Sequence, residues 1–381
     1  MPDITTLSMD HAPPEDPTAA SRKEDHIELA FRSQVEVMAL DGRFDYEPLL
    51  AAHPEPGSLP AVAFGNKTMK APLWVSSMTG GTEKAYVINQ NLGRVCAEFG
   101  LGMGLGSCRP LLYGKDRLVD FDIRPLTGDA VPLYANLGVA QVQEMLDAGR
   151  EGEIAQMCDL LRVDGLIVHV NPLQEAMQPE GDHFEVAPIV TIKALLVSLP
   201  DLPLIVKEVG QGMGPRSLAQ LLELPLLAID TAANGGTNFS KLELYRSDDM
   251  RREVYGPIVG VGHGAAEMVQ MINELVMLSR LQDIDDDQVV RLPSYVQPAR
   301  RIPQESKALA QVQCKHLVIS GGLQNFLDGY YLTEASELPA VYGQASAFLR
   351  YAREDYDTLQ RYVGSQIRGL ELARSYLRAR L

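Results

Sequence analysis

The sequence has 381 residues, of which 46% are hydrophobic and 22% charged, enough apolar material for one large soluble domain. The formal net charge of −16 disfavours binding to nucleic acid or to an anionic membrane. The cysteines form no CxxC pair, which disfavours a zinc site or a disulfide framework. Because free cysteines suit a reducing compartment, we expect a cytoplasmic protein. The four cysteines are Cys96, Cys108, Cys158 and Cys314.

The first 20 residues are rich in acids, prolines and small side chains. They lack the apolar core of a signal peptide, and no run in the chain approaches the roughly 20 apolar residues of a membrane span. We therefore predict a disordered tail over residues 1–20 and a single domain over residues 21–381.

Short apolar runs recur along this domain, with amphipathic stretches between them. Continuous runs of this kind are typical of parallel strands buried on both faces. The predicted strands are Leu73–Ser77, Leu101–Gly104, Pro132–Asn136, Gly165–Val170, Pro203–Glu208, Leu226–Asp230, Pro257–Val261 and His316–Ser320. The stretches that read as helices include Ala85–Phe99, Val139–Ala148, Val190–Leu199 and Ala265–Leu281.

Eight alternations of strand and helix predict a (β/α)8 TIM barrel. The alternative is a doubly wound nucleotide-binding fold, but no GxGxxG follows the first strand, and the glycines of Gly102–Gly106 have the wrong spacing. The acidic, proline-containing stretch over residues 283–306 reads as an insertion before the last predicted strand. The stretch Ala352–Leu381 predicts a C-terminal helix packed on the barrel or on a neighbouring subunit.

Polar residues and glycines follow seven of the eight predicted strands. In a barrel these strand ends converge on one face, where catalytic loops lie. One such group is a turn or cap as easily as a site, but their recurrence indicates an active site at the barrel mouth. The groups are Ser77–Gly81, Ser107–Arg109, Asn136–Gly138, His169–Asn171, Lys207–Glu208, Asp230 and Ser320–Gly322.

Two features suggest a phosphorylated flavin. The paired glycines of Ser320–Gly322 and of Gly235–Thr237 let backbone amides approach a phosphate. Lys207 lies in an apolar run, where a cation is costly to bury unless it meets an anion or an electron-rich ring. A salt bridge to Glu208 is the alternative, but neighbours on a strand point to opposite faces.

The stretch His169–Glu175 predicts binding of a second phosphate group. It offers neutral donors and one carboxylate, which suit hydrogen bonds to phosphate and a single Mg²⁺. The alternative is a core histidine followed by a polar turn. Basic residues at Arg22, Lys23 and Arg109, together with Ser107, suggest that the second ligand is an anion.

Taken together, these residues resemble the type 2 isopentenyl diphosphate isomerases, which are FMN-dependent (β/α)8 barrels. The matching motifs run from about residue 22 to 322 in the family's order, and HxNxxQE followed by QPEGD is the most specific of them. The motifs are Arg22–His26, Ser76–Gly81, Gly104–Arg109, Asn136–Gly138, His169–Glu175, Gln178–Asp182, Lys207–Gly210, Asp230 with Gly235–Thr237, and Ser320–Gly322.

The resemblance implies a role for each matching residue. Gln174 and His169 would be catalytic, and Glu175 would ligate Mg²⁺. The residues that would bind the substrate diphosphate are Arg22, Lys23, Ser107, Arg109, His169, Asn171 and Gln174. Those that would hold FMN are Met78, Thr79, Gly80, Ser107, Asn136, Lys207, Thr237, Gly321 and Gly322.

The resemblance also implies that the flavin works without net oxidation. Reduced FMN would move a proton to and from the allylic carbons, and NADPH would serve only to reduce FMN. The substrate would be a small-molecule diphosphate, and barrels of this family often form homo-oligomers.

The chain departs from the family at the end of its last motif. The family's arginine is replaced by Gln324, and Ser336 and Glu337 stand where the family has Gly-Ala. Ala232-Ala233 and Phe239 are further departures. If Glu337 faced the flavin phosphate, its charge would weaken binding, and we expect Arg300 and Arg301, or Lys315, to compensate.

Two other functions remain open. Another FMN barrel, oxidising a hydroxy acid or dihydroorotate, would share the lysine and glycines but has no need of HxNxxQE. A non-catalytic flavin- or diphosphate-binding relative would fit the altered phosphate end, but Gln174 and Glu175 are intact.

Overall fold

The computed structural model describes residues 18–281 and 311–381 and divides into two units, Met1–Asp45 with Arg380 and Tyr46–Ala379 with Leu381. The first unit contains α1 (Ala19–Leu29) and η1 (Val37–Ala39), and β1 (Phe44–Tyr46) begins at its end. The tail predicted over residues 1–20 lies outside the described residues as far as residue 17, and the insertion predicted over 283–306 lies outside them entirely.

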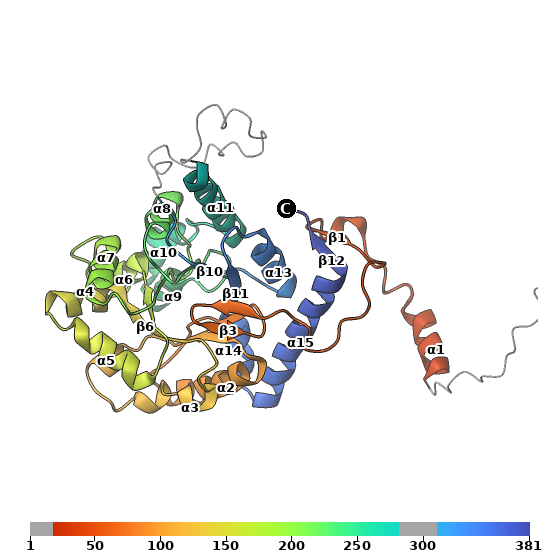
Figure 1. Ribbon diagram of the computed structural model, residues 1–381, viewed down its shortest axis with the longest axis horizontal. Coiled ribbons are helices and arrows are strands. Elements are labelled where there is room, and N and C mark those ends of the chain that lie inside the picture. Colours follow the sequence, from red (N-terminus) through yellow and green to blue (C-terminus); the bar gives the residue numbers. More distant parts are fainter. Residues whose placement is uncertain (1–17, 282–310) are drawn as a thin grey trace, which may run out of the picture. The chain divides into compact units, whose positions relative to one another are not determined.

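The second unit is a closed barrel of eight parallel strands surrounded by helices (Figure 1), which confirms the predicted (β/α)8 fold. The strands pair in the cyclic order β10-β11-β4-β5-β6-β7-β8-β9. They are β4 (Leu73–Val75), β5 (Gly102–Gly104), β6 (Leu133–Gly138), β7 (Leu166–His169), β8 (Leu204–Lys207), β9 (Ala228–Asp230), β10 (His316–Ser320) and β11 (Ala340–Gln344).

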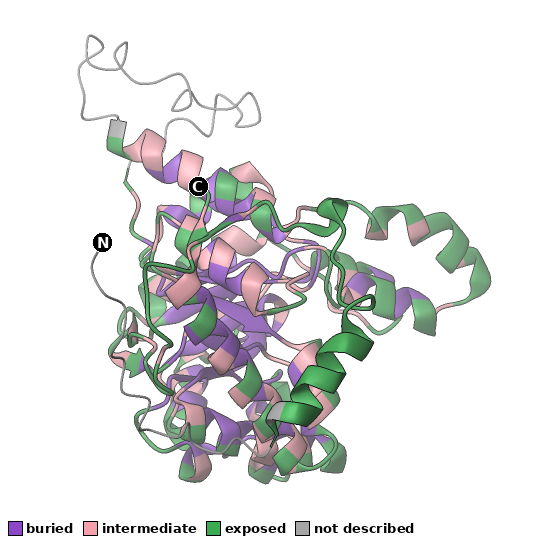
Figure 2. Cartoon of the chain, turned by 90° about the vertical axis from the view of Figure 1, so that its right-hand side faces the viewer, coloured by how far each residue is buried: buried purple, intermediate pink, exposed green. Residues whose placement is uncertain are grey.

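Burial explains why these strands are apolar throughout. Nearly every residue of the eight strands is buried, and Figure 2 shows them as a continuous buried layer inside more exposed helices. A strand that is covered on both faces has no solvent-exposed side. Its sequence therefore does not alternate between apolar and polar residues. Seven of the eight predicted strands coincide with β4 to β10.

One predicted strand, Pro257–Val261, was wrong. Pro257–Val261 overlaps the end of α10 (Asp249–Val259), and the strand that closes the barrel is β11 (Ala340–Gln344), which pairs with β10 and β4. A short apolar run bounded by glycine has the same appearance in a strand and in a helix end. The last predicted strand, His316–Ser320, is therefore the seventh strand of the barrel.

The helices lie between the strands and, after β11, close the chain. They are α2 (Glu83–Phe99), α3 (Arg124–Thr127), α4 (Val139–Asp147), α5 (Glu151–Leu161), α6 (Pro172–Met177), α7 (Pro188–Ser198), α8 (Pro215–Leu222), α9 (Phe239–Arg246), α10, α11 (Ala265–Leu281), α13 (Phe326–Ala335), α14 (Ser346–Ala352) and α15 (Tyr356–Tyr376). Short elements are η2 (Arg109–Leu112), η3 (Leu118–Asp120) and β12 (Leu377–Ala379). As predicted for the C-terminal stretch, α15 packs on the barrel, against α2, α13 and α14. No helix among the described residues is long and apolar enough to cross a membrane.

A hairpin closes the amino-terminal end of the barrel. It consists of β2 (Val62–Phe64) and β3 (Lys67–Met69), and the ring of Phe64 packs against Trp74 and Tyr134 at centroid distances of 5.0 and 6.0 Å. Gly102 makes room for this cluster, because a Cβ there would lie 2.3 Å from the Trp74 ring. The core at this end is therefore filled, and the opposite end is left for ligands.

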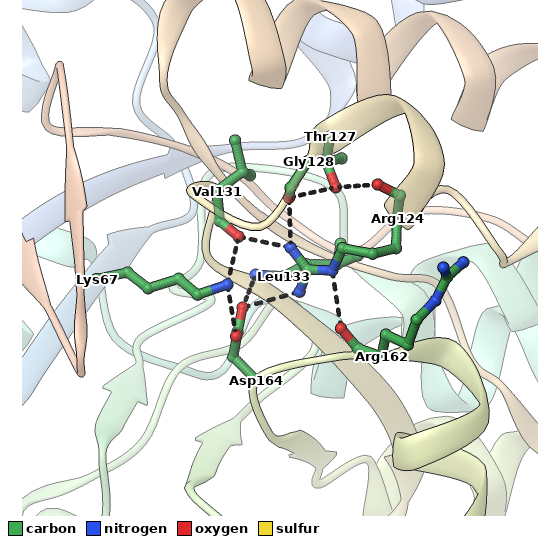
Figure 3. Close-up of polar contacts among 8 residues, drawn as sticks. All are labelled: Lys67, Arg124, Thr127, Gly128, Val131, Leu133, Arg162 and Asp164. Carbon is green, nitrogen blue, oxygen red and sulfur yellow. Dashed lines mark hydrogen bonds and ion pairs between the residues drawn. The ribbon is translucent and has the colours of Figure 1, made fainter.

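One partly buried carboxylate, that of Asp164, ties this hairpin to the barrel (Figure 3). Asp164 lies just before β7 and pairs with Lys67 of β3 at 2.6 Å and with Arg124 of α3 at 3.0 Å. It also accepts a hydrogen bond from the backbone N–H of Leu133, at 2.9 Å. Arg124 is 3% exposed and donates further hydrogen bonds to backbone carbonyl oxygens. Its buried charge is therefore balanced by Asp164 and by these acceptors.

Replacing Asp164 by Asn is expected to lower the free energy of unfolding by about 3 kcal/mol, because two cations lose their shared anion inside the protein. The measurement is urea denaturation, with the exposed residue Asp201 changed to Asn as the matched control. Equal stability of the two variants would contradict a structural role for the network.

Candidate active site

A cavity of about 440 Å³ opens at the carboxyl ends of β8, β9, β10, β11 and β4. This is the end of the barrel at which the sequence predicts the active site. The cavity is lined by Ser76, Ser77, Lys207, Val209, Gly210, Ala232, Ala233, Gly235, Gly236, Thr237, Phe239, Ser320–Gln324, Gly343–Ala347 and Arg350. Four predicted FMN residues, Lys207, Thr237, Gly321 and Gly322, are among them.

Two glycine pairs face each other across one part of this wall. A Cβ on Gly236 would lie 3.0 Å from the backbone nitrogen of Gly322, and a Cβ on Gly321 would lie 2.1 Å from the carbonyl oxygen of Ala233. Gly321 and Gly322 also have φ angles of +92° and +75°, which other residues rarely adopt. Only glycine allows the loops after β9 and β10 to meet here, so that backbone can line the cavity directly.

Three buried polar groups of the wall have no hydrogen-bond partner within residues 18–281 and 311–381. They are the hydroxyls of Ser76 and Ser77 and the amino group of Gln344. Buried polar groups in proteins are almost always hydrogen-bonded. The wall therefore suits a ligand that carries several polar atoms, as a phosphorylated flavin does.

The other predicted FMN residues lie outside the lining of the cavity. Met78, Thr79 and Gly80 follow β4, and their loop packs closely on the segment after β5, since a Cβ on Gly106 would lie 2.4 Å from the carbonyl oxygen of Thr79. Ser107 follows β5 and is exposed, and Asn136 is buried in β6.

Lys207 stands between two other ionisable residues at the strand ends. In the register of the barrel it pairs with His169 on β7 and with Asp230 on β9. The carboxylate of Glu208 accepts from the backbone N–H groups of residues 210, 211 and 212, and Lys207 Nζ donates to the carbonyl oxygen of Glu208 at 2.7 Å. The side chain of Lys207 thus lines the cavity, and the Glu208 carboxylate is engaged by backbone.

Asp230 is almost fully buried beside Lys207. Burial raises its pKa, although the charge of Lys207 and a hydrogen bond from the hydroxyl of Ser320 act in the opposite direction. The charge of Lys207 therefore limits how far burial raises the pKa of Asp230.

His169 at the end of β7 contacts Asn136 of β6, with 2.7 Å between Nδ1 of His169 and the side-chain oxygen of Asn136. Burial lowers the pKa of His169 to about 4, and the charge of Lys207 adds to the effect. The imidazole is thus neutral near pH 7. With Nδ1–H donating to Asn136, the lone pair of a neutral ring lies on Nε2.

This depressed pKa predicts an acid-dependent loss of stability. Above pH 6.5 the ring is neutral in both the folded and the unfolded chain, but between pH 6.5 and about 4 only the unfolded chain takes up a proton. The free energy of unfolding should fall over that range by at most about 3 kcal/mol more in the wild type than in His169→Gln. The measurement is denaturation at pH 7 and pH 4.5, with the exposed His183→Gln as control; equal falls in wild type and His169→Gln would refute it.

The predicted metal ligand lies in a separate hydrogen-bonded cluster at the same barrel end. Asn171 Nδ2 donates to Glu175 Oε1 at 2.6 Å and to Gln174 Oε1 at 3.2 Å, and the backbone N–H of Asp182 donates to Glu175 Oε2 at 2.8 Å. The side-chain oxygen of Asn171 is buried without a partner among the described residues. This oxygen and the adjacent carboxylate are ligand types that Mg²⁺ prefers.

Asp182 joins Arg109 to this cluster. Its carboxylate pairs with Arg109 Nη1 at 2.9 Å and accepts from Gln141 Nε2 at 2.6 Å. Asp182 was visible in the QPEGD motif but was given no role, and nothing in the sequence pointed to Gln141. In the described part of the chain no group of three or more His, Cys, Asp or Glu side chains gathers as a metal site.

Three predicted substrate residues, Arg109, Asn171 and Gln174, and the predicted metal ligand Glu175 are thus brought together through Asp182. Arg22 and Lys23 lie on α1 in the first unit, and their role remains a prediction. Ser107 makes no contact with the cluster through any hydrogen bond of the described residues.

The expectation that Glu337 faces the flavin phosphate was wrong. Glu337 precedes β11, whereas the cavity is lined by residues that end β11 and follow it. Its carboxylate instead pairs with Arg280 at 2.7 Å. Lys315 directly precedes β10, at the same far end of the barrel, so it is not placed to compensate. Arg300 and Arg301 lie outside the described residues.

Comparisons with known proteins identify sequence relatives of the chain. The chain is 32% identical over 265 residues to an isopentenyl-diphosphate delta-isomerase of Rickettsia akari (strain Hartford), which covers 67% of this chain and 74% of that protein. It is 33% identical over 264 residues to the protein of the same name from Rickettsia peacockii (strain Rustic), with the same coverage. No family model matches the chain.

Among solved structures, the chain resembles a mutant flavocytochrome b2 with benzoylformate, with a TM-score of 0.55 and 12% identity, over 87% of this chain and 71% of that one. The recombinant flavin-binding domain of baker's yeast flavocytochrome b2 gives a TM-score of 0.51 and 10% identity, over 87% and 72%. At such low identity the likeness shows the barrel fold.

Proposed function

This chain belongs to the isopentenyl-diphosphate delta-isomerase family, and we propose that it interconverts isopentenyl diphosphate and dimethylallyl diphosphate in the manner of the type 2 enzymes. The reaction would use reduced FMN and Mg²⁺, with NADPH needed only to reduce FMN. One observation carries this proposal: the glycine-lined cavity and the strand end that leads to the Glu175 cluster lie side by side. Lys207 of the cavity pairs in register with His169 of that strand end.

The cavity supports a phosphorylated flavin as its occupant. Thr237 and the glycine pairs would hold the phosphate end, and the unpartnered hydroxyls of Ser76 and Ser77 would bond to polar atoms of the cofactor. Lys207 would face the electron-rich end of the ring. When bound, the reduced flavin supplies an electron-rich partner for a carbocation-like allylic group.

The Glu175 cluster supports binding of the substrate diphosphate through Mg²⁺. Magnesium in such sites takes one or two carboxylates together with phosphate oxygens and water. Glu175 and the unpartnered oxygen of Asn171 would provide the protein oxygens, and Arg109 would pair with a phosphate oxygen. Arg22 and Lys23 are assigned to the diphosphate on the family resemblance.

His169 and Gln174 are the proposed catalytic residues. The neutral His169 ring, held by Asn136, presents Nε2 as an acceptor near pH 7. Gln174 receives a hydrogen bond from Asn171, which fixes the orientation of its amide next to Glu175. An alkene is a weak base, so these groups would act in a site from which water is excluded.

The test is an anaerobic assay of the purified protein with isopentenyl diphosphate, FMN, NADPH and Mg²⁺. We expect dimethylallyl diphosphate to form, and the rate to disappear when FMN or Mg²⁺ is omitted. Absence of product from a protein that binds reduced FMN would contradict the proposed reaction and favour the non-catalytic relative.

A further inference from the structure

Two cationic side chains line the cavity, and the site described above uses only one of them. Lys207 ends β8, whereas Arg350 lies on α14, the helix that follows β11. Strands β9 and β10, which carry the two glycine pairs, lie between β8 and β11 in the barrel. The cavity thus has a cation on either side of the glycine-lined wall.

Within residues 18–281 and 311–381, no carboxylate neutralises the charge of Arg350. Among the described residues it forms no ion pair, and its guanidinium lies 5.5 Å from the ring centroid of Tyr351. Most arginines of the barrel unit behave differently: Arg109, Arg124 and Arg246, for example, each pair with a carboxylate. In a chain with a net charge of −16, an unpaired arginine at a cavity wall is a ready partner for an anionic ligand.

A second, independent feature at this end also indicates a ligand with acceptor atoms. Gln344 is 4% exposed, and its side-chain oxygen accepts hydrogen bonds from Tyr362 Oη at 3.1 Å and from Gln366 Nε2 at 2.9 Å. These two donors fix the amide, so its amino group is left as a buried donor without a partner in a residue that lines the cavity. A buried N–H of this kind is costly unless an acceptor meets it.

The wall residue Gln324 carries no charge, and it stands where the family resemblance implies an arginine. A phosphate monoester has a charge of about −1.5 to −2 near pH 7 and three acceptor oxygens. Backbone amides of the glycine pairs supply donors but no net charge. A positive charge for the phosphate must therefore come from another side chain of the wall. Lys207 is already placed beside His169 and Asp230 in the strand register.

We infer that Arg350 is the residue that binds the phosphate group of the proposed flavin, and that it takes over the task of the missing arginine at Gln324. The inference rests on the proposed use of FMN, and it concerns a residue outside every motif that the resemblance matched. Gln344 donates a hydrogen bond to an oxygen at the same end of the cofactor.

The test is titration of the flavin-free protein with FMN and with riboflavin, which lacks the phosphate, followed by flavin fluorescence. Arg350→Gln should weaken FMN binding by about 10- to 100-fold, the range of a charge-assisted hydrogen bond, and leave riboflavin binding unchanged. Arg353→Gln is the matched control, because Arg353 is exposed, ends the same helix and is not part of the cavity wall. It should change neither affinity, and the FMN affinity of the wild type should fall more steeply with salt than that of Arg350→Gln.

Four outcomes would overturn the inference, and only the last of them also removes the proposed cofactor. If the wild type binds FMN and Arg350→Gln binds it equally well, Arg350 is not the phosphate ligand and the function stands. If Arg353→Gln weakens FMN as much as Arg350→Gln, or if Arg350→Gln weakens riboflavin as much as FMN, the effect is not recognition of the phosphate. If the wild type binds no FMN at all, the proposed cofactor falls together with this inference.

Discussion

Replacing Glu175 by Gln is expected to lower the rate of isomerisation on the order of 100-fold, because the proposed Mg²⁺ site has a single protein carboxylate. Glu175 is held by Asn171 and by the backbone of Asp182, and a neutral amide accepts from only one of these two donors. The affinity for Mg²⁺ should fall with the rate. The measurement is the initial rate as a function of Mg²⁺ concentration at saturating substrate.

Two controls separate metal binding from a general disturbance. The flavin spectrum and the thermal stability of Glu175→Gln should remain close to wild type, since the cavity wall does not include this residue. Glu185→Gln removes the same charge from an exposed position ten residues further on and should leave the rate unchanged. A Glu175→Gln protein with wild-type turnover and wild-type Mg²⁺ dependence would rule out the assigned role.

Replacing Lys207 by Met is the second change for which we expect a large effect. The cation at the cavity wall would no longer stabilise the negative charge of the reduced flavin, so turnover should fall about 100-fold or more. The reduction potential of the bound flavin should shift to a more negative value. The pKa of Asp230 should rise further, because Lys207 is the nearby charge that opposes the effect of burial.

The measurements for Lys207→Met are turnover and the potential of the bound flavin, each compared with Lys193→Met. Lys193 lies exposed on α7, so its loss changes the net charge by the same amount away from the cavity. An unchanged potential together with unchanged turnover would show that the lysine does not face the flavin.

The strands and strand ends that the sequence placed correctly in the barrel are those whose signal is local. Apolar runs such as Leu204–Lys207 predict a buried strand wherever they occur, and polar residues directly after them converge at one barrel end by geometry alone. Lys207 was noticed because a cation inside such a run is unusual. His169, Asn171 and Glu175 are predicted site residues on the basis of their spacing.

The errors arose where a segment's structure depends on packing. Pro257–Val261 has the β-branched composition of a strand but ends a helix, whereas Ala340–Gln344 contains glycine and glutamine and is held as a strand by pairing with β10 and β4. Missing this strand put Glu337 at the wrong end of the barrel. It also hid Arg350 and Gln344, whose proximity to the cavity follows only from the position of β11.

The pairing of Asp182 with Arg109 is of the same kind. The two residues are far apart in the sequence, and their contact depends on how the loop after α6 returns across the barrel mouth. A motif indicates that a residue is important, but its partner is defined by the tertiary fold. The role of Gln141, which also contacts Asp182, had no signal in the sequence.

If the chain catalyses a flavin-dependent reaction without net oxidation, the stoichiometry of reductant is the most direct test of that activity. The protein, FMN and Mg²⁺ are kept anaerobic, and NADPH oxidised is measured against dimethylallyl diphosphate formed from isopentenyl diphosphate. We predict many product molecules for each NADPH consumed, and equal activity when dithionite replaces NADPH. Consumption of one NADPH for every product molecule would contradict isomerase activity. It would favour an FMN-dependent oxidoreductase instead.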